Sequence, residues 1–215
     1  MTITQHPTDL SLAAYTAGHL DEGRSVVVEA HAAVCAHCRR WIARLAQVGG
    51  ILLTDGEPVA MSATSLPHAL ARIETKLTRG SPGVLAQAQN DAQLLPKAVQ
   101  AYSVGAWRWM GPGVSFRPIH VPAEGGARVF LLKASPGTRM PHHTHSGSEL
   151  TLVLRGAFSH VGGRYGPGDL DDADDSVEHQ PIVESGEDCV CLVAMEGNLR
   201  LLGPWSRILQ PFVRL

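Results

Sequence analysis

The chain has 215 residues, of which 44% are apolar and 18% charged, and its formal net charge is −2. This length allows one large domain or two modest ones. The near-neutral charge gives no support to direct nucleic-acid binding, and no apolar stretch approaches the ~20 residues of a membrane helix. The N-terminus lacks a signal-peptide pattern, so we expect a cytoplasmic protein whose four cysteines are thiols or metal ligands.

Residues 9–79 carry apolar side chains at helical spacing and predict an all-α N-terminal domain over residues 1–80. Four helices are expected. The first covers 10–17, the second opens at Asp21, the third carries Cys38 and ends at Gly49 and Gly50, and the fourth covers 67–79. A polar linker over 81–97 follows, and Gly and Pro residues mark its start. We therefore expect the two halves to fold separately.

From about residue 98 the pattern changes to short runs typical of β-strands. These runs lie at 114–118, 128–132, 149–154, 189–194 and 208–213. Many short strands at such spacing predict an all-β barrel of jelly-roll type over 98–215. The acidic run at 171–175 is expected to form a solvated loop.

The helical half contains a metal-ligand pattern, His31-x3-Cys35-x2-Cys38. One continuous helix would place the three side chains on one face, and a break after His31 would put the cysteines at the start of the next helix. Either arrangement converges one nitrogen and two thiolates, which suits tetrahedral zinc with one further ligand. His6, just before Pro7 and the first helix, is the best candidate for that ligand, and its rivals are His19 and His37.

The second half contains Gly137-x5-His143-x-His145-x3-Glu149-x6-Gly156. Two histidines two residues apart on a strand point to the same face. Glu149 follows a short turn that can return its carboxylate to that face, and the two glycines mark tight turns.

A fourth ligand of this second site is expected further along the chain. His179 follows a turn at 166–169, and the weaker candidates are Glu178 and His160. Three imidazoles and one carboxylate suit zinc, iron, manganese or nickel. Cys189 and Cys191 share one face of a strand, where they are either small core residues or an oxidant-sensitive pair.

Both patterns resemble known families. His6 with His31-x3-Cys35-x2-Cys38 resembles the zinc-binding anti-sigma domain, and residues 137–156 resemble the first cupin motif. A helical zinc module followed by a cupin resembles the ChrR-type anti-sigma factors across most of the chain. The chain has no cysteine before Cys35, which weakens a disulfide switch within the helical half.

The resemblance implies a regulator rather than an enzyme. Its partner would be a sigma factor of the extracytoplasmic-function (ECF) class, inhibited by the zinc-bound helical half and released when the cupin senses oxidative stress such as singlet oxygen. It also implies zinc at His6, His31, Cys35 and Cys38, and zinc or another divalent metal at His143, His145, Glu149 and His179. The alternative is a dioxygenase-like cupin enzyme with a helical docking module.

Overall fold

A computed structural model describes residues 2–78, 95–122 and 126–202. The first half is all-α, as predicted, with the helices α1 (Asp9–Thr16), α2 (Glu22–Val34), α3 (Ala36–Thr54) and α4 (Ser65–Thr78). A 3-10 turn at Lys97–Val99 leads into the second half. None of the described helices combines the length and apolar character needed to cross a lipid bilayer.

Side-chain caps begin the first three helices. Thr8 accepts a hydrogen bond from the Ser11 N–H at α1, and Asp21 accepts one from the Arg24 N–H at α2. Such caps satisfy amide groups that have no partner inside the helix. Cys35 both ends α2 and caps α3, with extended backbone angles of φ −98° and ψ 104°. The chain therefore breaks at Cys35 and does not form one continuous helix through Cys38.

The predicted end of the third helix at Gly49 and Gly50 was wrong. The helix α3 runs on to Thr54, and neither glycine adopts a positive φ. Glycine in a helix interior costs only about 1 kcal/mol relative to alanine. The residues that follow, Ile51, Leu52 and Leu53, continue the helix, so the pair lowers its stability without ending it.

The second half is all-β, and its strands are antiparallel. The strands are β1 (Ser103–Val104), β2 (Arg108–Gly111), β3 (Val114–His120), β4 (Arg128–Ala134), β5 (His143–His145), β6 (Glu149–Arg155), β7 (Phe158–His160), β8 (Gly163–Tyr165), β9 (Leu170–Ala173), β10 (Ile182–Val183), β11 (Cys189–Met195) and β12 (Leu199–Leu201). The strand expected at 208–213 lies outside the described residues.

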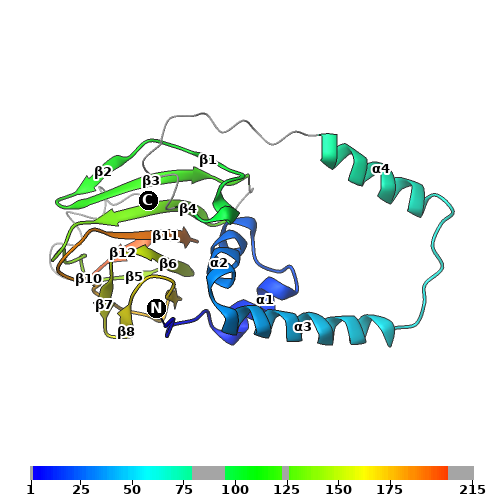
Figure 1. The fold of residues 1–215 in the computed structure, drawn as a ribbon, viewed down its shortest axis with the longest axis horizontal. Coiled ribbons are helices and arrows are strands. Elements are labelled where there is room, and N and C mark those ends of the chain that lie inside the picture. Colours follow the sequence, from blue (N-terminus) through cyan, green and yellow to red (C-terminus); the bar gives the residue numbers. More distant parts are fainter. Residues whose placement is uncertain (1, 79–94, 123–125, 203–215) are drawn as a thin grey trace.

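The strands form three sheets. A seven-stranded sheet has the order β1-β3-β4-β11-β6-β9, with β2 also paired to β3. The other described strands form two smaller sheets, β10-β7-β8 and β12-β5 (Figure 1). The all-β cupin class is confirmed, and the strands close around their core as separate sheets in place of one continuous barrel. Gly137 and Gly156 have φ of +75° and +69°, as expected for the two tight turns.

The large sheet is covered on both faces. Phe130, Val153 and Val193 point to one side and pack with side chains of the smaller sheets. Leu131, Leu152, Leu192 and their neighbours point to the other side and form one core with α1 and α2. Consequently every residue of β11 is buried.

The two halves share this core. Helix α2 packs on β4, β6 and β11, and Val27 and Val28 are fully buried there. Gly23 in its first turn lies so close to the sheet that an added Cβ would stand 2.6 Å from the Ala127 carbonyl oxygen. Separate folding of the first half stays a prediction, because in the full chain the helices and the sheet bury a common surface.

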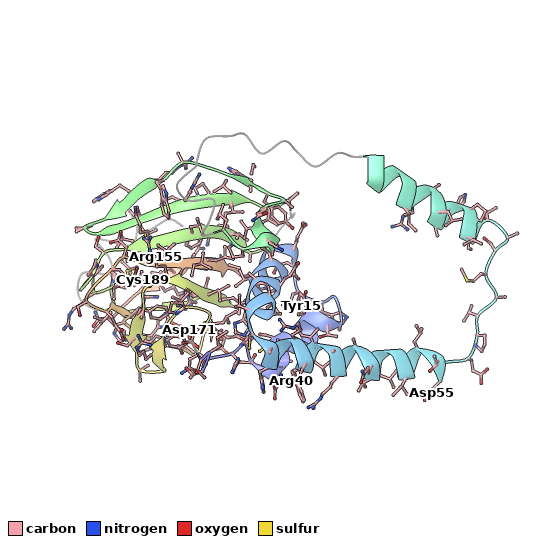
Figure 2. The ribbon with its side chains drawn as sticks, viewed as in Figure 1. Tyr15, Arg40, Asp55, Arg155, Asp171 and Cys189 are labelled. Atoms are coloured by element: carbon pink, nitrogen blue, oxygen red, sulfur yellow. The ribbon has the colours of Figure 1, made fainter. Side chains whose placement is uncertain are left out.

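The end of α3 and all of α4 have different surroundings. Figure 1 shows α3 extending away from the sheets and α4 standing apart from them. Figure 2 shows that the part of α3 between Arg40 and Asp55 projects beyond the β domain. Apolar side chains there are exposed, among them Leu52 at 70% and Leu66 at 65%.

The acidic run was predicted to be a solvated loop, and its first part is not. Asp171, Asp172 and Ala173 belong to β9, which pairs with β6, and Asp171 is buried. The loop begins only at Asp174, and Asp174 and Asp175 are exposed. Acidic residues are rare in strands, so composition favoured a loop, whereas β6 provides the edge to which β9 is paired.

Candidate metal centres

The structure brings together the four proposed ligands of the helical half. One ligand atom each from His6, His31, Cys35 and Cys38 lies within 4.8 Å of the other three. The His31 Nε2 is 3.3 Å from the Cys38 Sγ, and the His6 Nδ1 is 3.4 Å from the Cys35 Sγ and 3.5 Å from the Cys38 Sγ. The N-terminal segment thus folds back against the α2–α3 junction.

These separations fit a tetrahedral ion. Zinc–nitrogen and zinc–sulfur bonds of about 2.0 and 2.3 Å at the tetrahedral angle place nitrogen and sulfur about 3.5 Å apart. The three nitrogen–sulfur distances in the cluster lie within 0.2 Å of that value. The donor set of two imidazoles and two thiols is one that structural zinc sites use. The residues therefore fit the metal that the sequence pattern implies.

The hydrogen bond on the far side of His31 fixes its tautomer. Its Nδ1 is 2.9 Å from the carbonyl oxygen of Gly168, which can only accept. Nδ1 therefore carries the proton, and Nε2 presents a lone pair to the cluster. Burial lowers the pKa of His31 to about 4, so the ring is neutral near neutral pH.

Both thiols of this cluster are buried. Burial, followed by the neighbouring Cys35, raises the pKa of Cys38 to about 12. A cation placed among these donors would favour the thiolate form. The two rival histidines, His19 and His37, are exposed and lie outside the cluster. The ring of His37 only flanks that of His6, with 4.9 Å between the ring centres.

The second cluster lies inside the β domain. One ring nitrogen each from His143, His145 and His179 lies within 4.8 Å of the other two, and all three residues are buried. The Nε2 of His179 is 2.9 Å from that of His143 and 3.1 Å from that of His145. Strand β5 supplies the first two ligands, and a backbone bridge between His143 and His179 holds the third beside them.

Three converging nitrogens cannot satisfy one another by hydrogen bonds. The Nδ1 of His143 is 2.7 Å from the Pro141 carbonyl, so it carries the proton and leaves Nε2 bare. The single proton that His179 could place on Nε2 can serve only one neighbour. Metal–nitrogen bonds of about 2.1 Å at right angles place nitrogens about 3.0 Å apart, so the spacing fits three adjacent positions on one cation.

Glu149 lies beside this cluster but not within it. Its Oε2 is 3.5 Å from the Nδ1 of His145, and its Oε1 accepts a hydrogen bond of 2.9 Å from Thr151. The converging donor atoms therefore come from the three imidazoles. The Glu149 carboxylate lies instead beside the outer nitrogen of His145. Glu149 as a direct ligand stays a prediction.

Asp171 and His160 lie next to the imidazole cluster, on the side of His179. The Asp171 Oδ2 is 2.9 Å from the His160 Nε2 and 3.9 Å from the His179 Nδ1. Carboxylates on the outer nitrogen of a ligating histidine orient its ring. Sequence reasoning missed Asp171, because it was counted with the solvated acidic run. It placed His160 nearby as a weak ligand candidate, while the other weak candidate, Glu178, is exposed.

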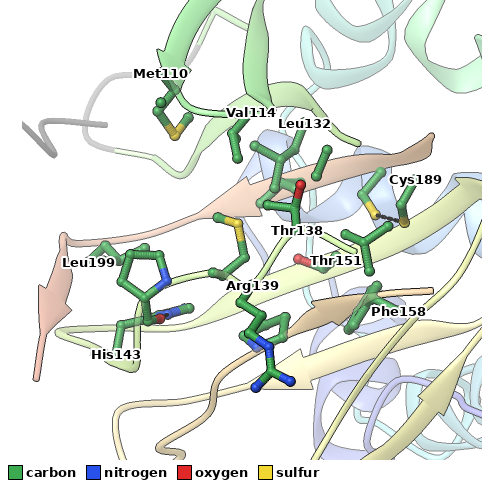
Figure 3. A pocket seen from close by; sticks show the side chains of 18 of the residues that line it. Met110, Val114, Leu132, Thr138, Arg139, His143, Thr151, Phe158, Cys189 and Leu199 are labelled. Atoms are coloured by element: carbon green, nitrogen blue, oxygen red, sulfur yellow. Dashed lines mark hydrogen bonds between the residues drawn. The ribbon is translucent and has the colours of Figure 1, made fainter. Parts of the chain in front are cut away.

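The imidazole cluster adjoins a cavity of about 330 Å³ with mainly apolar walls. Figure 3 shows His143 at one end and Met110, Leu132, Phe158 and Cys189 around the walls. Cys189 and Cys191 lie on one face of β11, as their spacing predicted, and both line this cavity, with 3.7 Å between their sulfur atoms. The hydrogen bond with the Cys189 thiol, and then burial, raise the pKa of Cys191, so Cys191 stays a protonated thiol.

Comparisons with known proteins agree with this architecture. Residues 96–198 match the family model of the ChrR cupin-like domain. The anti-sigma-E factor ChrR of Cereibacter sphaeroides is 39% identical over 215 residues, which are the whole of both chains. The crystal structure of Rhodobacter sphaeroides SigE in complex with the anti-sigma ChrR matches with a TM-score of 0.69 and 36% identity, covering 91% of this chain and 100% of that one. The chain belongs to the ChrR family of anti-sigma factors.

Proposed function

We propose that this chain binds and inhibits an ECF sigma factor through its helical half. The observation that carries the proposal is the match over 91% of the chain to a ChrR structure determined as a complex with SigE. A relative that is a regulator also favours this class over the dioxygenase-like enzyme. Sigma factors act on RNA polymerase in the cytoplasm, so the proposal places the chain there.

The helical half offers a surface for such a partner. Six exposed apolar residues on α3 and α4, which we name the outer surface, are Val48, Ile51, Leu52, Leu66, Leu70 and Ile73. On α3, Ile51 and Leu52 follow Val48 by three and four residues, and on α4 the spacings are four and three, so each set shares one side of its helix. Apolar side chains that stay exposed along one side of a helix are suited to packing against a partner protein.

The test is co-expression with a cognate ECF sigma factor, chosen from those of the organism that carries this gene. The full chain should co-purify with that sigma factor in a stable complex and abolish transcription from its promoter in a purified system. A folded, metal-loaded chain that neither binds nor inhibits this sigma factor would show the proposed partner to be wrong. An ECF sigma factor from a distant system serves as the specificity control.

Zinc is the metal we propose for the helical site, held by His6, His31, Cys35 and Cys38. Its role is structural, because closed tetrahedral sites with two thiolates tie helices together. For the cupin site we propose zinc or another divalent metal, held by His143, His145 and His179 with Glu149. A bound cation there would hold the three rings and polarise whatever reaches the cavity.

The cupin half, in this proposal, senses oxidative stress such as singlet oxygen. The support is chemical. Imidazole, thiol and thioether groups are oxidisable, and Cys189, Cys191 and Met140 line the cavity beside the imidazole cluster. Loss of one ligand would loosen the site and, through contacts with the helices, weaken the hold on sigma.

The sensing role is tested with H143A in a sigma-dependent reporter strain. Basal inhibition should stay intact, and the induction ratio on exposure to singlet oxygen should fall severalfold. H120A removes an exposed histidine from β3 and should leave the ratio unchanged. Normal induction by H143A, with the cupin metal shown to be absent, would exclude this site as the sensor.

A further inference from the structure

One short segment of the cupin half contacts the ligands of the helical metal site. Residues 166–172, which we name the latch, comprise the turn before β9 and its first three residues. The Leu170 N–H donates to the Gln5 carbonyl at 3.2 Å, so the N-terminal segment pairs with the start of β9. His6 follows directly in the chain.

The N-terminal segment is held by a buried carboxylate. The Oδ1 of Asp169 accepts hydrogen bonds from the N–H groups of Thr4 at 2.7 Å and Gln5 at 3.0 Å. Its Oδ2 accepts from the Gly166 N–H at 2.8 Å, and the residue is only 4% exposed. Hydrogen bonds to an ionised acceptor are about twice as strong as neutral ones, so Asp169 binds the segment firmly on one side of His6.

A second carboxylate holds the other side of His6. The Oδ2 of Asp172 accepts from the Thr8 N–H at 2.8 Å and from its hydroxyl at 2.9 Å. Gly168, in turn, accepts the Nδ1 proton of His31 through its carbonyl. Both imidazole ligands of the helical site are therefore positioned by the latch.

The close fit around Gly168 supports a specific contact. Its φ is +89°, and an added Cβ would lie 2.9 Å from two carbons of Ile3. A side chain at this position would both strain the turn and displace the N-terminal segment. The carbonyl can reach His31 only because the chain turns here in this conformation.

The latch also reaches the cupin site. Neighbouring side chains on a strand point to opposite faces, and Asp171, next to Asp172 on β9, points into the cavity, 2.9 Å from His160 and 3.9 Å from His179. The strand β9 thus carries Asp172, a support of the helical site, on one face and Asp171, a neighbour of the cupin ligands, on the other, while Asp169 lies in the turn just before it.

We propose that the latch is a working part of the helical metal site, with Gly168, Asp169 and Asp172 as positioning residues for His6 and His31. The metal affinity of the helical half therefore depends on the cupin half, and displacement of β9 in the cupin weakens the helical site. This inference rests on the proposed metal site of the helical half, and it names the route by which the two halves are coupled.

The test is a cobalt titration of the metal-stripped full chain. Co²⁺ bound by thiolates gives a sulfur-to-metal charge-transfer band. If the C35S variant lacks this band, the band belongs to the helical site. In D169A/D172A the affinity read from this band should fall at least tenfold. The control D174A/D175A removes the same charge from the two exposed positions just after β9 and should change this affinity less than twofold.

The outcomes are distinct. No thiolate band in the wild-type chain would overturn the helical metal site itself and the latch with it. A normal band and unchanged affinity in a folded D169A/D172A would overturn the latch alone. If that variant does not fold, two other measurements test the latch: cobalt binding by D172A and amide hydrogen exchange in the wild-type chain. Weaker cobalt binding by D172A and slow exchange of the Thr4, Gln5 and Thr8 amides support the latch, whereas unchanged binding or exchange as fast as in an unstructured peptide overturns it.

Discussion

The two ends of the helical half differ in what covers them. Helices α1 and α2 contribute Leu12 and Val26 to Val28 to the core that they share with the large sheet, whereas the outer surface of α3 and α4 leaves its apolar side chains exposed. The proposed metal cluster lies where the two regions meet, at the α2–α3 junction. The difference teaches that one part of this half is fixed to the cupin and the other part presents the surface that we propose binds sigma. Changes in the first should alter stability, and changes in the second should alter binding.

Loss of the helical metal should have the largest effect. C38A removes one of the four donors, and structural zinc in small domains contributes on the order of 10 kcal/mol. We expect one metal ion fewer per chain by elemental analysis, and a melting temperature lowered by more than ten degrees. C189A, which alters a cysteine of the cupin cavity, should keep this metal. A C38A chain with full metal content would contradict the assignment.

Charges on the outer surface should abolish sigma binding without unfolding the chain. L70D/I73D places two carboxylates on exposed positions of α4, where the free energy of unfolding should change by less than about 0.5 kcal/mol per site. A buried interface would lose about 2–4 kcal/mol per central residue, so calorimetry should show the Kd for sigma rising at least a hundredfold. V161D, at an exposed cupin position, is the matched control and should bind normally. Weak binding by both variants would refute a specific surface.

Gly23→Ala should loosen the contact between α2 and the sheet. The added methyl group would meet the Ala127 carbonyl and the Val129 side chain at 2.6 and 2.9 Å, and overpacking of this kind costs about 1–3 kcal/mol. Denaturant unfolding measures the loss. Gly49→Ala, whose Cβ would meet no atom within 4 Å, should instead stabilise α3 by up to about 1 kcal/mol. Equal changes in unfolding free energy at both positions would contradict the view that α2 is packed tightly on the sheet while the end of α3 is not.

The smallest effect concerns the charge that begins α2. Burial raises the pKa of Asp21, but hydrogen bonds from the Arg24 and Ala127 N–H groups and the Arg24 guanidinium outweigh it and hold this pKa below the usual 3.8. Asn can still cap the helix, so D21N should cost only about 0.5–1 kcal/mol near pH 7.

The sign of this pH dependence follows from the lowered pKa. The carboxylate stabilises the fold above its unfolded pKa, and the stabilisation is lost as pH falls through the folded value. The difference in unfolding free energy between wild type and D21N should therefore shrink from about pH 5 to about pH 3. A difference that grows on acidification would show that the charge does not stabilise the fold.

Much of the fold was accessible from sequence because local patterns agree with the packing. Apolar spacing predicted the helices, and turn residues predicted the short strands. His6, His31, Cys35 and Cys38 were placed together from spacing and a resemblance, and the three cupin histidines from two separated motifs. Each of these sets converges in the structure.

What sequence missed depends on contacts between distant segments. The contacts of Asp169 and Asp172 cannot be read from a turn and an acidic run, because their partners, Thr4, Gln5 and Thr8, lie more than 160 residues earlier. Gly49 and Gly50 signalled a helix end, but no left-handed turn forms there. A polar linker suggested independent halves, whereas residues of both halves form one core in the full chain.

The break at Cys35 makes α3 a lever. The 19 residues of this helix span about 28 Å at ~1.5 Å per residue, and the pivot is a single extended residue whose sulfur lies in the proposed metal cluster. A rotation of about ten degrees at the pivot would move the far end by about 5 Å at that length. A change of bonding at one sulfur atom would thus be magnified into a displacement as large as a side chain at the outer surface, enough to separate two packed faces.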